Sequence, residues 1–202
     1  MDVGSGRDYS GSMPNPRDLA FFLSLAAGLA ADQATKWWVV SHLEHMIDEI
    51  ELVPGWFSIV HAQNTGAAFS TMEGQRGLFL AFTAIAVVVV ADLWRRQPRE
   101  QWAVPAILGM ILSGALGNGL DRLLQGHVTD FLKVFAGHEP WRGWFVERFG
   151  TYVWPIFNVA DSLLLVGVVL FGAYWLFQRE GEVAEEEPPP AGSPPAASSP
   201  GS

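Results

Sequence analysis

The sequence is dominated by four hydrophobic segments that are separated by polar stretches. They span approximately residues 18–40, 77–94, 101–122 and 153–178. A helix needs about 20 mostly apolar residues to cross a bilayer. The third and fourth segments meet this requirement directly, the second meets it if it extends to Trp94, and the first does so if Asp32 and Lys36 lie near one end. The pattern therefore predicts four transmembrane helices.

Residues 1–17 and 179–202 differ in composition from the chain between them. The first stretch is rich in Gly, Ser, Asp and Pro, and the second is a Glu run followed by Pro, Ala and Ser. Such sequences bury too little apolar surface to fold, so we expect two disordered tails. A cleaved signal peptide is an alternative for the first hydrophobic run. However, the run resumes with Trp37 and Trp38, which are typical of a span that ends at the membrane interface.

The basic residues predict how the spans are oriented. They are Arg7 and Arg17 before the first segment, Arg95, Arg96 and Arg99 between the second and third, and Arg179 after the fourth. Four spans place all six on one side, which should be cytoplasmic together with both termini. Residues 41–76 and 123–152 then form two extracytoplasmic loops. Residues 56–60 and 128–132 in these loops have the character of β-strands.

Composition narrows the available chemistry. The net charge of −9 suggests a soluble acidic protein, but residues 179–202 contain five Glu and one Arg, so much of the charge belongs to the tail. The absence of cysteine excludes disulfides, Cys-ligated metals and Cys nucleophiles. No basic block extends beyond residues 95–99, so nucleic-acid binding is not expected. His42 and His45 form an H-x-x-H without further ligands, and we predict no metal site and no cofactor.

Polar residues gather at one end of the first and third segments. Asp32 and Lys36 are four residues apart, so they share a helix face and can form an ion pair. At the end of the third segment, Asn118 stands three residues before Asp121 and four before Arg122. These three side chains share a face if the helix continues. Small residues just before them allow close helix contacts.

Further polar residues lie in the loops and at the start of the fourth segment. Asn64 and Gly66 belong to a turn-like stretch of small residues, and Gly66 permits a positive φ. Asp130 follows in the predicted strand, while Asn158 and Asp161 open the fourth span with a spacing of three. Ionisable groups in a membrane are costly and normally face a cavity or a partner. We therefore expect one polar cluster near the extracytoplasmic interface.

Carboxylates, amides and one arginine are the chemical groups of this cluster. Two carboxylates that share a site cannot both ionise easily. The ionised one can accept a proton from water while the protonated one polarises a peptide carbonyl, which is aspartic peptidase chemistry. Two alternatives remain: a small transporter or channel subunit with intramembrane carboxylates, and a structural membrane adaptor with an interhelical ion-pair network.

Four segments in this order resemble the lipoprotein signal peptidases (signal peptidase II), which are four-span aspartic peptidases of the bacterial inner membrane. The resemblance covers roughly residues 18–178. The matching segments are Asp32–Lys36, Asn64–Phe69, Gly114–Arg122 with Val128–Phe131, and Phe157–Asp161. It implies an all-α membrane fold of four transmembrane helices, a small extracytoplasmic β-sheet that cradles the substrate, and an extracytoplasmic lid segment within residues 133–154.

The resemblance also implies a reaction and roles for individual residues. Prolipoproteins would be cleaved just before a Cys that already carries diacylglycerol, and globomycin-type cyclic peptides would inhibit. Asp130 and Asp161 would be the catalytic pair. Substrate-binding or supporting roles would fall to Asn64, Gly66, Asn118, Asp121, Arg122, Asn158, Asp32 and Lys36. Membrane lipid would be a further partner.

Two departures from the family pattern stand out. The chain has Ser113 where the family usually has Gly, a small change that should be tolerated. The stretch between Asp130 and Asp161 is also longer than expected, and it includes the aromatic sequence from Gly137 to Trp144. The shape of the lid and the substrate preference are the properties that this insertion would affect.

Overall fold

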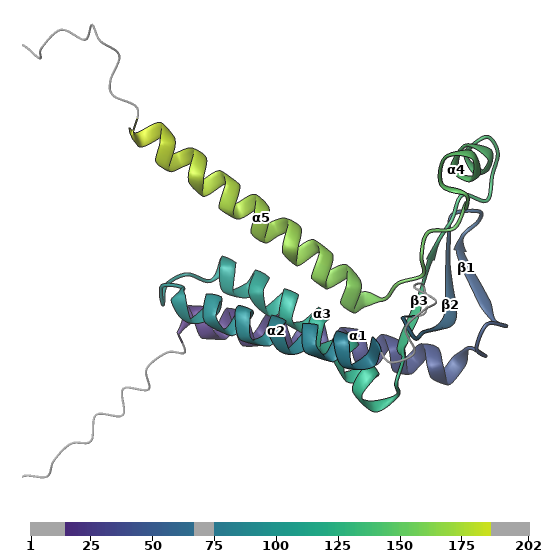
Figure 1. Ribbon diagram of the computed structural model, residues 1–202, viewed down its shortest axis with the longest axis horizontal. Helices are drawn as coiled ribbons and strands as arrows, with labels where there is room; N and C mark the ends of the chain where they lie inside the picture. Colours follow the sequence, from purple (N-terminus) through teal and green to yellow (C-terminus); the bar gives the residue numbers. More distant parts are fainter. Residues whose placement is uncertain (1–14, 67–74, 187–202) are drawn as a thin grey trace, which may run out of the picture.

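The computed structural model describes residues 15–66 and 75–186. Five helices and three strands lie in these ranges: α1 (Pro16–His42), β1 (Glu49–Val53), β2 (Phe57–Asn64), α2 (Gln75–Arg96), α3 (Ala103–Leu124), β3 (Val128–Val134), α4 (Trp141–Phe149) and α5 (Val159–Glu186). Figure 1 shows the long helices α1, α2 and α3 side by side, with the sheet and α4 at one end. The prediction of a mostly helical chain with a small β-sheet is confirmed.

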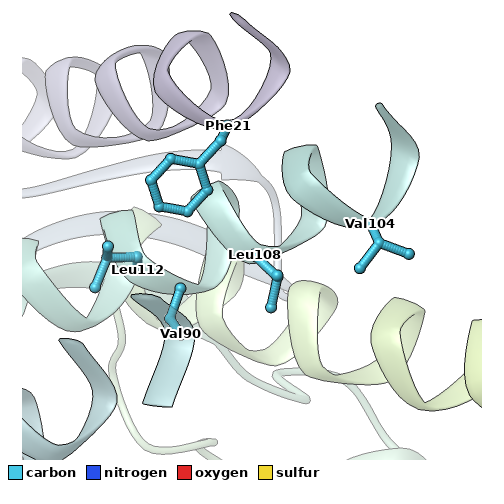
Figure 2. Close-up of a cluster of buried hydrophobic side chains, with 5 residues drawn as sticks. All are labelled: Phe21, Val90, Val104, Leu108 and Leu112. Carbon is cyan, nitrogen blue, oxygen red and sulfur yellow. The ribbon is translucent and has the colours of Figure 1, made fainter. Parts of the chain in front are cut away.

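Helix α3 is the centre of the helical part and packs against α1, α2 and α5. Its core contacts come from apolar residues that recur every three or four positions, which places them on one helix face. Figure 2 shows Val104, Leu108 and Leu112 of α3 with Phe21 of α1 and Val90 of α2, all of them buried. These five residues form the apolar core between the three helices.

Three of the described helices are long and apolar enough to cross a membrane. They cover Arg76–Arg96, Ala103–Leu124 and Val159–Gln178. Helix α1 has 27 residues, but Asp32, Lys36 and the polar positions around them lower its hydropathy. Its role as a fourth span therefore stays a prediction.

The N-terminus of α1 lies against the loop between α2 and α3. The backbone N–H of Arg17 donates to the carbonyl of Arg99 at 3.2 Å, and the guanidinium of Arg17 lies over the ring of Trp94. Tyr174, far along α5, accepts a hydrogen bond from Gln101 at 2.8 Å. Arg17 at the start of α1 thus lies close to Arg95 and Arg99 at the end of α2 and in the loop after it. This is the end of the bundle opposite the sheet (Figure 1).

The sheet is antiparallel with the order β1–β2–β3. In its third strand, Val128, Thr129, Asp130 and Phe131 are all buried, although a strand with one covered face would alternate between buried and exposed positions. The reason is that β3 is covered on more than one side: it pairs with β2, contacts α1 and α3, and receives the segment before α5 along its free edge. The strand prediction is confirmed, and its burial is greater than the pattern implied.

Residues 152–157 run along the free edge of β3 before α5 begins. Phe157 exchanges hydrogen bonds with Leu132, and the N–H of Trp154 donates to Val134 at 2.9 Å. Pro155 has no backbone N–H to donate and disfavours helical geometry in the residue before it. Helix α5 therefore starts after Pro155, at Val159, and not near residue 153 as predicted. This edge pairing places Asn158 and Asp161 next to β3.

The two predicted tails are only partly within the described residues. Positions 1–14 and 187–202 lie outside them. At the C-terminal end, α5 continues to Glu186. The prediction of a disordered tail from residue 179 is therefore wrong for residues 179–186, which are helical. Glu, Arg and Ala favour helix, and the first proline is Pro188.

Candidate active site

Asp130 lies in the buried part of β3 with only 2% of its surface exposed. One carboxylate oxygen accepts a hydrogen bond from Asn64 Nδ2 at 2.9 Å, and the other accepts from Asn158 Nδ2 at 2.7 Å. Burial raises the pKa of Asp130 to about 6, and the negative charge of Asp161 adds to this rise, while the two amide donors oppose it. Asp130 is therefore a carboxyl that can hold a proton near neutral pH.

Asp161 is held by the N-terminal cap of α5. The Asn158 side chain accepts the N–H of Asp161 at 2.9 Å, and the Asp161 carboxylate accepts the N–H of Asn158 at 3.1 Å. This reciprocal pair is a capping box, in which positions three residues apart satisfy each other's free N–H groups. A negative charge in the first turn is also favoured by the helix dipole. The spacing of three fixes the Asp161 carboxylate at the start of the helix.

Asn158 joins the two aspartates. It is fully buried, and its Nδ2 group lies within hydrogen-bond distance of Asp130 Oδ1, of Asn118 Oδ1 at 3.0 Å and of the Thr129 carbonyl at 3.3 Å. Asn118 in turn donates to Asp161 Oδ1 at 2.7 Å. Asp130 is consequently held by the amides of Asn64 and Asn158, and Asp161 by the amide of Asn118 and the backbone N–H of Asn158, so Asn158 is the residue that contacts both.

A buried cation, Lys36, contacts the amide of Asn118. Lys36 Nζ lies 2.9 Å from Asp32 Oδ2, from Asp121 Oδ2 and from Asn118 Oδ1, and 4% of the residue is exposed. The predicted pairing of Asp32 with Lys36 is confirmed. Gln33 donates to both carboxylates of this group, at 3.1 and 3.3 Å. Removal of any charge here would leave a buried partner without compensation, which is strongly destabilising.

Asp32 and Asp121 of this ion group also contact the two segments that carry Asp161 and Asp130. The N–H of Ala160 donates to Asp32 Oδ1 at 3.0 Å, and the N–H of Thr129 donates to Asp121 Oδ2 at 3.2 Å. Ala160 and Thr129 are the neighbours of Asp161 and Asp130 in the sequence. The carboxylates of α1 and α3 thus position the backbone on which the aspartate pair is carried.

Close helix packing allows these contacts. A β-carbon at Gly117 would collide with the Asp32 carboxylate, and one at Gly114 would collide with the backbone carbonyl of Ala160. Ser113, which departs from the family pattern, is fully buried, and its Oγ donates to the Met110 carbonyl at 2.7 Å. It packs against Gly28 of α1, where an added β-carbon would meet it. The serine fits because the facing residue has no side chain.

Arg122 and Asn64 lie at the rim of the site. Arg122 is partly buried, with its guanidinium over the ring of Phe79 at 4.2 Å, and it interacts electrostatically with Asp161 and Asp130. Asn64 Oδ1 accepts the N–H of Gly66 at 2.9 Å, which forms a turn at a residue with φ of 82°. The remainder of this motif, residues 67–69, lies outside the described residues.

The structure therefore brings the predicted cluster together from four segments of the chain. Two contributors were not singled out from the sequence: Gln33, and the backbone N–H groups of Thr129 and Ala160. Gln33 lies within the segment Asp32–Lys36, and its position next to a buried carboxylate is the signal in the sequence that points to it. His42 stacks on Trp38 and His45 contacts His61. No metal-binding group of three or more His, Asp or Glu occurs in residues 15–66 and 75–186.

The arrangement contains two carboxylates of unequal environment, each oriented by amide donors. One has a raised pKa and can donate a proton, while the other lies where a negative charge is favoured. Such a pair can activate water and polarise a carbonyl. The guanidinium of Arg122 adds a positive charge near the pair.

Comparisons with known proteins all point to one family. A family model described as signal peptidase (SPase) II matches residues 24–177. A lipoprotein signal peptidase from Xylella fastidiosa strain M12 is 35% identical over 171 residues, which are 82% of this chain and 93% of the relative. One from Geobacter metallireducens is 40% identical over 160 residues, which are 78% of this chain and 89% of the relative.

A further relative and two solved structures extend the comparison. A lipoprotein signal peptidase from Symbiobacterium thermophilum is 37% identical over 164 residues, which are 81% of this chain and 98% of the relative. Two bacterial membrane enzymes solved by the in meso method each superpose with a TM-score of 0.66. One is 26% identical and covers 79% of this chain and 93% of its own; the other is 25% identical and covers 84% and 92%.

Proposed function

The chain belongs to the signal peptidase II family, and we propose that it is an aspartic endopeptidase that removes signal peptides from diacylglyceryl-modified prolipoproteins. Cleavage would occur just before the lipidated Cys. The observation that supports this proposal is the pair Asp130 and Asp161. Their carboxylates come from separate segments, and both accept hydrogen bonds from Asn158. Relatives named lipoprotein signal peptidase supply the substrate class.

The proposed mechanism assigns a role to each carboxylate. Asp161, in the first turn of α5, accepts a proton from the attacking water. Asp130, whose pKa is raised to about 6 by burial, carries the proton of the pair and donates it toward the carbonyl oxygen of the scissile bond. As the tetrahedral intermediate collapses, Asp130 takes its proton back from the former carbonyl oxygen, and Asp161 passes the proton taken from water to the leaving amine. A coupled pair of this kind gives a bell-shaped pH–rate profile.

Asn118 and Asn158 act as positioning residues in this mechanism. Asn158 is fully buried and its amide is already used by the two aspartates and Thr129, so it has little to offer a substrate. Within the described ranges, the guanidinium of Arg122 makes one hydrogen bond, from Nη1 to the Asn118 carbonyl at 3.4 Å. Its remaining donors are directed to a substrate carbonyl in our proposal.

We also propose the membrane orientation of the site. α1 would be the fourth span, with its ion group near the end that carries the sheet. The Arg-rich end formed by α1 and the α2–α3 loop would be cytoplasmic, with both termini on that side. The aspartate pair would then lie at the extracytoplasmic face, where a diacylglyceryl group in the bilayer brings the scissile bond. The sheet would cradle the peptide, and residues 133–154 would include a lid.

Cleavage of a lipidated precursor in proteoliposomes tests the proposal. Asp130→Asn and Asp161→Asn should each abolish cleavage, whereas Asp48→Asn, which removes an exposed carboxylate, should leave it intact. Unmodified precursor should be cleaved poorly, and globomycin should inhibit. Full activity in either dyad variant, with normal insertion, would rule out the assigned pair. Proton or ion flux that depends on Asp161 without proteolysis would instead favour a transporter.

A further inference from the structure

Helix α4 and the segment after it present aromatic side chains to the surroundings. Trp141 is 54% exposed, Trp144 52%, Phe149 61% and Trp154 65%. These residues belong to the insertion that departs from the family pattern. Figure 1 places α4 at the end of the sheet, away from the bundle of α1, α2 and α3. Exposed aromatic residues grouped in this way usually mark an interaction surface.

An apolar cavity lies behind these side chains. It has a volume of about 480 Å³ and is lined mainly by α4, the end of β3 and the segment before α5, including Phe145, Phe149, Val134 and Trp154. Val134 stands four residues after Asp130 on β3, so the cavity lies roughly 13 Å along the strand from the proposed catalytic carboxyl. Its lining offers almost no hydrogen-bonding groups, which suits hydrocarbon and not a polar peptide backbone.

Exposed apolar side chains also occur on α5, the next helix in the chain. Trp154 precedes this helix by five residues, and Leu165, Val168 and Val169 on the helix are between 54% and 66% exposed. A spanning helix exposes such residues to acyl chains. The aromatic residues just before it stand at the depth where Trp is enriched in membrane proteins, between headgroups and hydrocarbon.

The charges of α4 fit the same environment. Arg142 and Arg148 are exposed, and the guanidinium of Arg142 lies over the ring of Tyr152 at 4.6 Å. Arginine on an aromatic surface can bind phosphate groups while its neighbours enter the apolar layer. With 3.6 residues per turn, Phe149 and Glu147 are roughly 160° apart around the helix. Glu147 is also roughly 120° from Trp141, but only roughly 60° from Trp144.

We propose that residues 141–154 form an interfacial docking element that inserts its aromatic side chains into the outer leaflet beside α5, with lipid acyl chains covering the apolar cavity. This inference rests on the proposed orientation, in which the sheet is extracytoplasmic. Docking of α4 on the lipid holds the far end of the sheet at the bilayer surface. The extended segment before α5 is thereby fixed between two membrane contacts.

Single-cysteine labelling tests the proposal, because the native chain has no cysteine. Phe149→Cys, Trp141→Cys, Glu147→Cys and Val168→Cys are each labelled with bimane in nanodiscs of phosphatidylcholine and phosphatidylglycerol. The discs contain lipids brominated either near the headgroup or deep in the acyl chain. We expect shallow-brominated lipid to quench the labels at 149 and 141 at least twofold more than the label at 147. Deep-brominated lipid should quench the label at 168.

The outcomes separate the two proposals. Quenching at 168 with equal, weak quenching at 149, 141 and 147 would overturn the docking element and leave the spanning orientation intact. Absence of quenching at 168 would contradict the orientation itself. Two α4 positions are used because Phe149 lines the cavity and its loss can change the local packing, whereas Trp141 is not among the lining residues. A change at 149 that follows addition of a lipopeptide substrate, without quenching by lipid, would assign the surface to substrate and overturn the lipid proposal.

Discussion

Replacement of Asp130 by Asn should change protein stability in a pH-dependent way. The pKa of this carboxyl rises from 3.8 to about 6 on folding. A raised carboxyl pKa means that the folded state binds more protons than the unfolded state between these two values. The ionised group therefore destabilises the fold above pH 6, by about 3 kcal/mol for a shift of about two units, and has no such effect below pH 4. Asp130→Asn removes this cost.

The substitution also loses hydrogen bonds. Asn64 and Asn158 both donate to Asp130, whereas an amide offers one acceptor oxygen and places its own NH₂ group against a donor. We take this loss as about 1–2 kcal/mol. The variant should thus be more stable than the native chain by about 1–2 kcal/mol at pH 8 and less stable by a similar amount at pH 4. The free-energy difference should change by about 3 kcal/mol, or roughly 6–12 °C in Tm, across this range.

Thermal unfolding of both proteins in detergent, from pH 4 to pH 8, measures this difference, and the same samples are assayed for cleavage. Asp48→Asn provides the matched control, since it removes an exposed carboxylate outside the site. A variant that is inactive yet more stable at pH 8 would show that the buried charge is kept for catalysis. Lower stability at every pH, with no change in the difference, would refute the reasoning and favour a purely structural network.

Three further predictions concern the groups around the pair. Asn158→Ser and Asn158→Ala should both lower kcat on the order of 100-fold and raise the pKa of Asp130 in the pH–rate profile, but the Ala variant should lose about 1 kcal/mol more stability because Ser can still cap the helix. Lys36→Met should lower the free energy of unfolding by about 3–5 kcal/mol, measured by denaturation, because two buried carboxylates lose their cation. Gly114→Ala should cost about 1–3 kcal/mol, whereas Gly172→Ala in α5, with no atoms near its position, should be neutral or slightly stabilising.

Much of the helical layout and the membership of the cluster could be predicted from the sequence. Long apolar runs have few alternatives to spanning helices, and polar residues within them are too costly to be accidental. For this reason Asp32, Lys36 and Asn118 stood out before their contacts were known. These residues come together because the ends of their helices lie close to each other, and the apolar pattern predicted those ends to within a few residues.

The features that escaped prediction depend on contacts between distant segments. The burial of Thr129 and Asp130 arises because β2, α1 and α3 surround β3 and the chain before α5 returns along its edge, and nothing local in the strand encodes these contacts. Helix α4 is short, and its aromatic residues carry no clear polar–apolar period. The helical turns after Arg179 agree with the helix propensity of Glu, Arg and Ala, which a prediction from the overall composition of the tail does not take into account.

The N-terminus of α5 explains why this site combines structure and chemistry in the same residues. Asn158 caps the helix and holds Asp130, Asp161 completes the capping box, and Asp32 accepts the next free N–H of the helix from Ala160. Each of these hydrogen bonds at the N-terminus of α5 also helps to orient a proposed catalytic group. A substitution that frees the helix end therefore displaces the carboxylates, and one that alters the carboxylates weakens the cap. Stability and activity are consequently coupled at this point, except at Asp130, which is on the sheet and outside the cap. That is why Asp130 is the residue at which activity can be removed and stability gained together.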